Sequence, residues 1–358
     1  MSVRQVKSIG IVGYGSYIPR SRIKVEDIVN VWHNTTTKIQ KERLISYEKV
    51  VAAPDEDTIT LAFEAARNAL CKAEIDAEEL GAVYLGSCTS PYVSKSSATV
   101  ISEAIGTKRE IMCADLQFSG KSGTAAMQIC MALVGAGMIN YGLAIGSDDI
   151  SSRTQPSDRS ECQASVGSAA IIIGESRVLA EIEGTCSYTS DTTDYFRVDG
   201  DRYIRYGGSI DLGKMGYEKH TIEASRCLMK KLGHEPRDYA FAVFQQHSGA
   251  RPFAVGKALG FTKEQITLGN LAPEIGDCGA ASSLLGLTAV LDQAQPNDRI
   301  LLTSYGFGAG SDAFSLVVTA EAKKTQSSNS SVKSQISNRK YIDYATYLKF
   351  ERKHVREY

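Results

Sequence analysis

The sequence has no excess of charge of either sign and no long apolar run. Its 40 Lys and Arg residues nearly balance 41 Asp and Glu residues, which gives a formal net charge of −1. A chain without a basic field has no electrostatic basis for binding nucleic acid or an anionic membrane surface, so we expect neither partner. No stretch of about 18 apolar residues is present, which argues against a membrane-spanning helix.

Cysteine pairs and clusters with metal-binding spacing are also missing. The eight cysteines include no Cys-x-x-Cys pair and no Cys/His group, and most of them lie in apolar segments. We therefore expect reduced thiols, no metal site and no resident cofactor, as in a cytoplasmic protein. The apolar stretch near the N-terminus is short and interrupted by glycine, so we expect no signal peptide.

What the sequence does contain is a regular alternation of short apolar strands with helices. The predicted strands are Ser8–Gly13, Ala82–Gly86, Met112–Phe118, Gly142–Gly146, Ala169–Gly174, Ala240–Phe244, Ile300–Ser304 and Ala313–Val318. The predicted helices are Ile59–Ala73, Ala98–Ile105, Ser122–Ala136, Thr221–Lys231, Phe253–Leu259 and Ala280–Gln293. This alternation predicts an α/β fold in which sheets are buried between helices.

The two halves of the chain resemble each other. In the first half GKSGTAAMQICMALVGAG leads into YGLAIGSD, and in the second CGAASSLLGLTAVLDQA leads into ILLTSYGFG. Helices so rich in Gly, Ala and Ser let neighbouring backbones approach closely, as a helix between two sheets requires. The pattern favours a duplicated five-layer αβαβα sandwich with halves at 1–175 and 176–321, although two generic βαβ units could match by coincidence.

The C-terminal part changes character twice. Residues 322–338 are rich in Ser and Lys without apolar periodicity, which is typical of a flexible linker. Residues 339–358 interleave four tyrosines and a phenylalanine with charged residues. So aromatic a tail is expected to dock, either on its own body or on a partner.

Three segments have features of a functional site. Cys113–Thr124 combines a strand, a tight turn and a helix start, and so places residue 120 where a helix N-terminus favours a thiolate or an oxyanion. Phe244–Pro252 is a strand end with polar residues, and Ser304–Ser311 is a Gly-rich turn. Each of these signals is weak by itself.

With these segments the chain resembles the 3-hydroxy-3-methylglutaryl-CoA synthase family of the thiolase superfamily, especially its short archaeal-type members. The family motif A-D-L-x-F-x-C-K-x-G-T reads ADLQFSGKSGT here, with Gly120 at the position of the nucleophilic cysteine. By the same resemblance Cys88 stands for the acid/base glutamate, Gln245 for the histidine and Asp277 for the asparagine. A glycine cannot form the covalent acyl intermediate. We therefore expect these four positions to be relics of the family site and expect no catalytic residue at them.

A narrower resemblance links YLGSCTSPY, CADLQFSGKSGT and SYGFGAGSDA to the synthase-like, non-nucleophilic subunits of bacterial phloroglucinol C-acetyltransferases. It implies a structural subunit of a multi-component acyltransferase that acts on acylphloroglucinols. The implied partners are a second copy of the chain, a thiolase-like catalytic subunit and a small OB-fold, zinc-ribbon protein. The homodimer would form through the strand near Met112–Phe118, as in the superfamily.

The alternative is an acyl-CoA condensing enzyme that uses rearranged residues. Cys88 ends a strand that faces the pocket and could act as a replacement nucleophile, or it could be a small buried thiol. His247 lies two residues beyond Gln245 and could reach inward, or it could be a loop histidine bonded to backbone or water. Asp277 could be a weak base, or the cap of a helix.

Overall fold

The computed structural model describes residues 8–32, 45–117, 120–158, 160–207, 214–308, 310–324 and 331–352. Its main feature is a nine-stranded mixed sheet with the strand order β11-β12-β13-β8-β1-β7-β6-β4-β5. The strands of its first half are β1 Gly10–Tyr17, β4 Leu80–Gly86, β5 Met112–Leu116, β6 Tyr141–Asp149 and β7 Val166–Gly174. Those of its second half are β8 Ala180–Thr189, β11 Phe241–Phe244, β12 Arg299–Thr303 and β13 Gly310–Val318.

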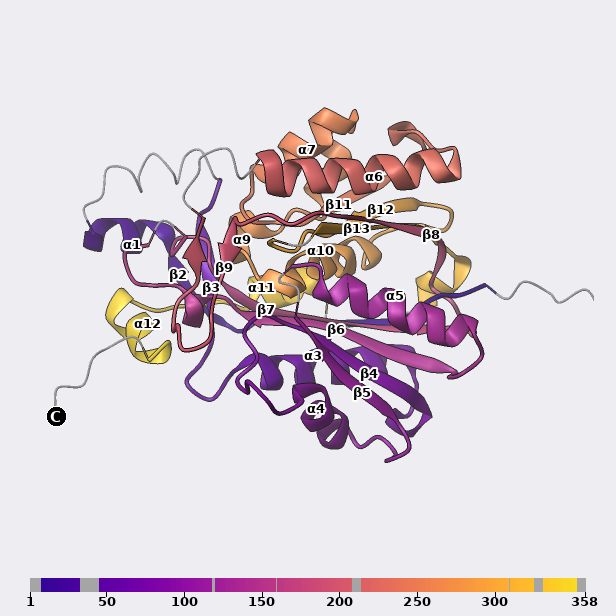
Figure 1. Cartoon of the computed structure of the whole chain (residues 1–358), viewed down its shortest axis with the longest axis horizontal. Helices are drawn as coiled ribbons and strands as arrows, with labels where there is room; N and C mark the ends of the chain where they lie inside the picture. The colour runs from indigo at the N-terminus through magenta and orange to yellow at the C-terminus, as the bar shows by residue number, and fades with distance from the viewer. Residues whose placement is uncertain are drawn as a thin grey trace, which may run out of the picture.

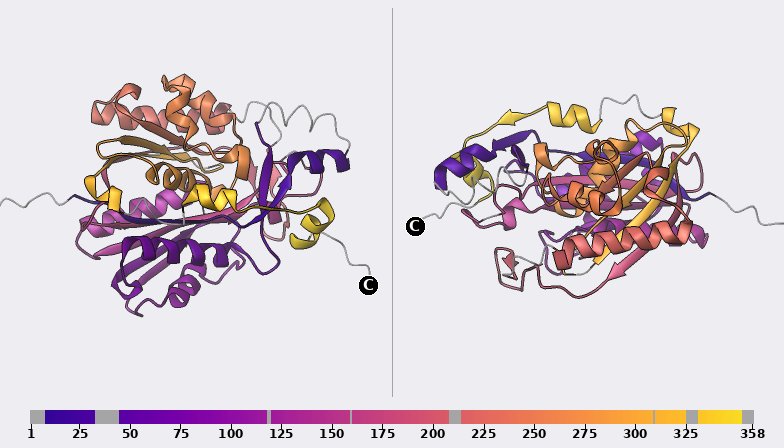
Figure 2. Two further views of the ribbon diagram at one scale, coloured as in Figure 1. Left: turned by 180° about the vertical axis from the view of Figure 1, so that it is seen from behind. Right: turned by 90° about the horizontal axis from the view of Figure 1, so that it is seen from above.

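Helices cover both outer faces and fill the middle (Figure 1). The helices are α3 Thr58–Ala73 and α4 Ser97–Ile105 on one outside, α5 Ser122–Gly135 and α10 Ser282–Leu291 in the centre, and α6 Lys219–Leu232 and α7 Arg251–Leu259 on the other outside. The view from behind shows the same succession of helix, sheet, helix, sheet and helix (Figure 2). The predicted five-layer αβαβα arrangement is confirmed.

The two central helices are where small residues matter most. All ten residues of α10 are buried, and α5 is buried along one face. A Cβ added at Gly86 would lie 2.3 Å from the backbone of Ser122, and one added at Gly146 would lie 2.3 Å from the carbonyl oxygen of Ala280. Any side chain at these two glycines would therefore push a central helix away from its sheet.

Helix α3 shows how local sequence sets an element. Asp57 accepts hydrogen bonds from the backbone of Ile59 and Thr60, and the Thr60 side chain completes a capping box. The buried stripe is mostly alanine, which lets the helix lie close to β1: a Cβ at Gly15 would lie 2.4 Å from the carbonyl oxygen of Ala65. Glu74, with φ 53°, ends the helix in the left-handed region.

Strand β8 joins the two halves and was not among the predicted strands. It pairs with β13 over Ala180–Thr189 and with β1 at Gly10 and Ile11. The hydrogen-bonded sheet is therefore continuous from β11 to β5. The strand has only one fully buried residue, Ala180, so its sequence lacks the strong apolar alternation that marks the others.

The C-terminal segment packs against the N-terminal part of the chain. Where a linker is expected over 322–338, the described residues include helix α11 Val332–Ser337, and residues 325–330 lie outside the described residues. Strand β14 Lys340–Tyr341 then pairs in parallel with β2 Ser21–Lys24, and helix α12 Tyr344–Phe350 follows. Within the described residues the tail thus lies on its own chain.

Helix α12 covers a fully buried lysine. Lys49 donates from Nζ to the Ala164 carbonyl at 2.8 Å, to Ser151 Oγ at 3.0 Å and to the Tyr347 hydroxyl at 3.1 Å. Nζ also lies 4.4 Å from the Tyr347 ring centroid. A buried ammonium needs such partners, so the tail stabilises the strand that carries it, β3 Glu48–Val51.

We expect Tyr347→Phe to lower the free energy of unfolding by about 1–2 kcal/mol, because it removes one acceptor from a buried charge. Urea denaturation would measure the change. Tyr341→Phe is the control: its hydroxyl bonds Glu48 from an exposed ring, so a loss below about 0.5 kcal/mol is expected. Equal losses in the two variants would contradict this account.

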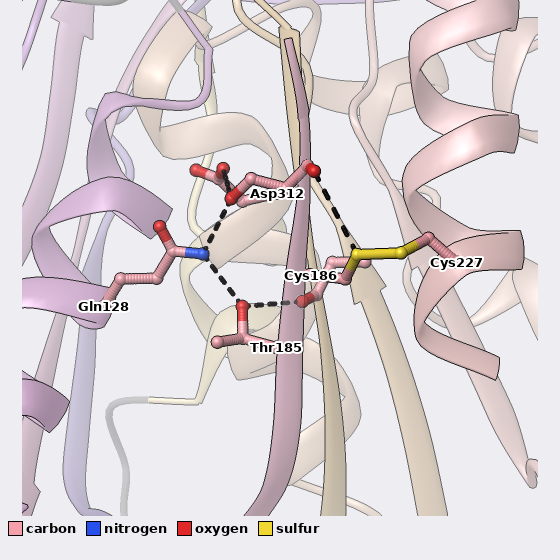
Figure 3. The surroundings of a disulfide bond; sticks show 7 residues. Gln128, Thr185, Cys186, Cys227 and Asp312 are labelled. Carbon is pink, nitrogen blue, oxygen red and sulfur yellow. Dashed lines mark hydrogen bonds between the residues drawn. A yellow bond between two sulfur atoms is a disulfide. The ribbon is translucent and has the colours of Figure 1, made fainter. Parts of the chain in front are cut away.

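The expectation of eight reduced thiols is wrong for two of them. Cys186 of β8 and Cys227 of α6 form a disulfide bond (Figure 3), and the other six cysteines take part in no disulfide bond. Within the described ranges no helix has both the length and the apolar character that a bilayer crossing requires.

Candidate functional site

The expected site positions follow the carboxyl ends of parallel strands. Strand β4 runs parallel to β5 and β6 in the first half, and β11 runs parallel to β12 in the second. Cys88 follows β4, Gly120 follows β5 and Gln245 follows β11. Since the carboxyl ends of parallel strands lie at one edge of a sheet, side chains from distant segments meet there.

Gly120 occupies a closed position. Its φ is +60°, and a Cβ added there would lie 1.8 Å from the carbonyl oxygen of Tyr305 and 3.1 Å from Gln245 Nε2. A side chain would therefore strain the backbone and collide with another backbone segment. The turn at which the family places its nucleophile therefore has no space for a side chain.

Gln245 fills the space beside Gly120. It is fully buried, and its Nε2 donates to the carbonyl oxygen of Gly279 at 2.7 Å. Its Oε1 is enclosed and has no hydrogen-bond partner among the described residues. The side chain holds the turn that follows Asp277 and supplies no ionisable group.

Cys88 belongs to a different network, centred on Asp148 at the end of β6. Asp148 Oδ1 accepts from Ser87 Oγ at 2.8 Å, from the Cys88 amide at 2.8 Å, and from the amide and hydroxyl of Thr89 at 3.1 and 2.7 Å. Oδ2 accepts from the Ala280 amide at 2.7 Å, and the Cys88 thiol lies 3.6 Å away from the same oxygen. The thiol, half-buried, thus donates to a fully buried carboxyl group.

The pKa of Asp148 is raised. Complete burial disfavours the charged form and is the largest cause, while the hydrogen bonds from Ala280, Thr89, Ser87 and Cys88 act in the opposite direction. The Cys88 thiol donates to Oδ2 of this carboxyl group, 3.6 Å away. Asp148 is therefore placed to take the proton of the Cys88 thiol.

A second pair of groups lies in the other half. His247 Nδ1 and Asp277 Oδ2 are 2.9 Å apart, and the other carboxylate oxygen of Asp277 accepts from the Gly279 amide and from Ser282 Oγ, each at 2.9 Å. Asp277 is thus both the cap that its place in sequence favours and the partner of a histidine. His247 lies in a loop, as the preferred expectation had it, but its partner is a carboxylate and not the expected backbone group or water.

The imidazole sits among aromatic rings and lines a small cavity. It stacks on Phe307 at 4.4 Å between centroids and meets Tyr217 edge-on at 5.1 Å. Its Nε2 is enclosed and has no hydrogen-bond partner in the described part of the chain. The cavity of about 30 Å³ is lined by Ile150, Thr154, Ser160, Gln163, Ala164, Tyr195, Ile204, His247, Asp277 and Phe307.

One cationic side chain lies near the thiol. Arg153 follows β6 in the short helix Ser151–Arg153, and its Nε is enclosed without a described partner. Its pKa is lowered, chiefly by burial and by the neighbouring Arg197, although Asp149 and Cys88 oppose the shift. The guanidinium adds positive charge close to the Cys88 sulfur.

The structure therefore places the expected residues in three neighbouring pairs. Gly120 and Gln245 pack against each other, Cys88 joins Asp148, and His247 joins Asp277. The turn from Asp277 to Ala280 links the groups through its contacts with Gln245 and Asp148. No group of His, Cys, Asp and Glu suited to a metal ion occurs among the residues that the structure describes.

Sequence reasoning missed Asp148 and Arg153. A signal for Asp148 was present, because the apolar strand YGLAIGSDD ends in two carboxylates at the same sheet edge as Cys88. Arg153 carried no such signal, since an isolated arginine after a strand is usually solvated.

No family model matches the chain. Among solved structures it is similar to MvaS in complex with 3-hydroxy-3-methylglutaryl coenzyme A, with a TM-score of 0.85 and 19% identity over 97% of this chain and 92% of that one. It is also similar to 3-oxoacyl-[acyl-carrier-protein] synthase III from Aquifex aeolicus, with a TM-score of 0.79 and 23% identity over 86% of this chain and 99% of that one. At these identities the likeness establishes the thiolase-like fold.

Curated relatives are much closer in sequence. The chain is 48% identical to the hydroxymethylglutaryl-CoA synthase of Methanocaldococcus jannaschii over 344 residues, which covers 96% of this chain and 99% of the relative. It is 47% identical to that of Archaeoglobus fulgidus over 345 residues, covering 96% and 99%. It is 45% identical to that of Methanosarcina mazei over 348 residues, covering 97% and 99%.

These relatives correct the principal functional expectation. A structural, nucleophile-lacking subunit of a phloroglucinol C-acyltransferase is contradicted, because the proteins matched at 45–48% identity over nearly their whole length are named as synthases. The comparisons favour the alternative, a condensing enzyme in its own right. By identity and coverage, this chain belongs to the hydroxymethylglutaryl-CoA synthase family.

Proposed function

We propose that this chain is an acyl-CoA condensing enzyme of the hydroxymethylglutaryl-CoA synthase type, in which His247 is the general base and Cys88 carries the acyl group. The observation that supports it most directly is the His247–Asp277 pair. A carboxylate 2.9 Å from Nδ1 holds that nitrogen protonated, which leaves Nε2 as a proton acceptor. That nitrogen has no hydrogen-bond partner among the described residues, and the ring borders the cavity.

The acyl-transfer step uses the Cys88–Asp148 contact. The thiol proton passes to Asp148 Oδ2, 3.6 Å from the sulfur, and the sulfur attacks the carbonyl carbon of an acyl thioester. A new carbon–sulfur bond forms to Cys88, the old one to the carrier breaks, and the carrier thiolate leaves with a proton. Arg153 stabilises the negative charge that develops on sulfur during this exchange.

The condensation step uses the imidazole. A hydroxymethylglutaryl product contains a 3-hydroxy carbon that bears a methyl group, so it arises when an acetyl carbanion adds to the ketone of an acetoacetyl thioester. His247 Nε2 takes a proton from the acetyl methyl group, and the resulting carbanion forms the new carbon–carbon bond to the ketone carbon. The imidazolium then gives its proton to the ketone oxygen, which becomes the hydroxyl. Water then cleaves the thioester to Cys88 and frees the thiol.

The closed pocket at Gly120 supports this relocation of chemistry. A side chain cannot occupy position 120 without displacing the Tyr305 carbonyl, so the acyl group needs another sulfur. Of the six cysteines outside the disulfide bond, Cys130, Cys162 and Cys278 are buried, and Cys71 lies on the exposed side of α3. Cys113 is half-buried within β5. Cys88 is a half-buried thiol after a strand end, with its sulfur 3.6 Å from a buried carboxylate oxygen.

Acetyl-CoA labelling tests the proposal. We expect the purified chain to gain one acetyl group, located at Cys88 by peptide mass spectrometry, and Cys88→Ser to gain none at neutral pH. Cys71→Ser is the matched control and should label like the unchanged chain. The absence of label on the unchanged chain would sink the proposal, as would label that appears only after addition of a thiolase-like or OB-fold protein.

We also propose that the chain forms a homodimer through β5. That strand is the last of the sheet, with β4 on one side, and all five of its residues are half-buried. An uncovered edge of this kind favours pairing with a second copy. Light scattering should give twice the mass of the chain, and a monomeric mass at micromolar concentration would contradict the pairing.

A further inference from the structure

The disulfide between Cys186 and Cys227 encloses a segment that carries part of the candidate site. The two cysteines are 41 positions apart and tie β8 to α6. The segment between them includes Asp194 and Tyr195 near the hairpin β9 Tyr195–Phe196 with β10 Arg205–Tyr206, and also Tyr217 just before α6. These three residues reach the aromatic surroundings of His247.

Each of the three has a defined contact there. Asp194 accepts from the Tyr305 hydroxyl and from the Gly308 amide at 2.9 Å. Tyr195 packs on Phe307 at 4.0 Å between centroids and lines the cavity. Tyr217 donates to the Gln245 carbonyl at 2.6 Å. The position of the enclosed segment thus sets the wall of the cavity around the imidazole.

The strand side of the disulfide is hydrogen-bonded to helix α5 through Gln128 (Figure 3). Gln128 of α5 donates to Thr185 at 2.8 Å and to Ser187 at 3.0 Å, on either side of Cys186. Ser187 in turn donates to Asp312 at 2.7 Å, and Asp312 forms a buried ion pair with Lys121 at 2.8 Å. Lys121 directly follows Gly120, so hydrogen bonds connect the strand side of the disulfide to the turn at Gly120.

One of the two disulfide-bonded residues is exposed to solvent. Cys227 lies on the exposed face of α6, and Cys186 is half-buried. Exposure of one sulfur is what thiol–disulfide exchange requires, because the attacking thiolate must approach along the sulfur–sulfur axis. The buried cysteines Cys130 and Cys278 offer no such access, and burial raises the pKa of each.

We propose that Cys186 and Cys227 form a reversible thiol–disulfide site, reduced by small or protein dithiols, and that its state controls the order of the cavity wall. A thiolate of the reductant attacks Cys227 Sγ, and Cys186 leaves as a thiolate. The second thiol of the reductant then releases Cys227 and closes the reductant to a disulfide. Its two thiols supply two electrons and two protons, which leave the chain with two thiols.

The physical consequence follows from chain entropy. A cross-link across 41 positions limits the conformations open to the enclosed segment, and reduction restores them. Local opening of 188–207 and 214–226 should become more frequent, while helices outside the loop keep their stability. The effect on catalysis rests on the proposed function, whereas thiol state and local opening do not.

Dithiothreitol treatment of the full chain tests the site. Alkylation after denaturation should label six cysteines in the untreated protein and all eight after reduction. Hydrogen exchange of amides in 188–207 and 214–226 should become at least about tenfold faster on reduction, and the midpoint of thermal unfolding should fall by roughly 5 °C. Amides of α3 should not change.

Two variants separate the site from general effects of the reagent. The double variant Cys186→Ser/Cys227→Ser should show fast exchange with or without dithiothreitol, and Cys71→Ser should respond like the unchanged chain. Eight alkylated cysteines before reduction would overturn the site itself. Equal exchange in both states would overturn the control of the wall, and neither outcome depends on whether Cys88 takes up an acetyl group.

Discussion

Replacement of His247 by asparagine is expected to lower the turnover number for condensation of acetyl-CoA with acetoacetyl-CoA by about 10²–10⁴-fold, the usual contribution of one general base. Asparagine keeps a hydrogen-bonding group near Asp277 but has no nitrogen that can accept the methyl proton. KM should change little, because the lost interaction is made in the transition state. Steady-state rates with both substrates measure the two effects separately.

His234→Asn is the matched control for this prediction. His234 follows α6, and its Nδ1 lies 3.3 Å from the Tyr239 hydroxyl, away from the cavity. We expect its turnover to stay within about threefold of the unchanged chain, a difference below about 1 kcal/mol in the barrier. A His247→Asn variant with normal turnover would remove the imidazole from the mechanism, whatever the result at Cys88.

Gly120→Cys is expected to destabilise the protein and to add no condensing activity. The new side chain meets the Tyr305 carbonyl oxygen at 1.8 Å and occupies a backbone with φ +60°. Overpacking and left-handed strain together should lower the free energy of unfolding by roughly 3–5 kcal/mol. Chemical denaturation measures this loss, and acetyl-CoA labelling should find no acyl group at position 120.

Gly106→Cys is the control that carries the backbone strain without the collision. Gly106 also has a left-handed φ, +80°, yet a Cβ there meets nothing within 4 Å. Gly106→Cys should therefore lower the free energy of unfolding by only about 1–2 kcal/mol. An equal loss of unfolding free energy in both variants would show that a side chain at position 120 does not collide with the Tyr305 carbonyl.

A variant that also carries Cys88→Glu, Gln245→His and Asp277→Asn asks whether the family arrangement can be rebuilt. We expect Gly120→Cys alone to give no more turnover than the unchanged chain, because groups that act as a unit contribute far from additively. Turnover by the single variant well above that of the unchanged chain would show a synthase pocket that lacks one sulfur. That result would contradict the placement of the chemistry at Cys88 and His247.

Much of the fold could be predicted because its signals are local. Predicted strands such as Ala82–Gly86 and Ala313–Val318 lie within the observed β4 and β13, since continuous apolar runs between turn residues mark buried strands. The helix Ala280–Gln293 was placed by its small residues and is buried over Ser282–Leu291. Strand β8 escaped because its residues are mostly half-buried, so alternation is weak.

The candidate site could be predicted only in part. Resemblance placed Gly120, Cys88, Gln245 and Asp277 near one another, and residue chemistry named His247 as a fallback. The pairing of His247 with Asp277 could not be predicted, because it joins residues 30 positions apart through the path of two loops. The disulfide was missed for a similar reason, since neither cysteine has a pattern that marks a partner 41 positions away.

The place of β1 in the sheet affects how the chain folds during its synthesis. Strand β1 ends at Tyr17, and its partners are β7, which ends at Gly174, and the start of β8. At about 5–20 residues per second, a ribosome needs on the order of 10 s to make the residues between them. Over that time the segment GIVGYGSY, buried in the finished protein, is exposed without its neighbours. The nascent chain therefore carries an unpaired aggregation-prone strand until about half of the protein has been made, and chaperone binding at the N-terminus should raise the yield of native protein.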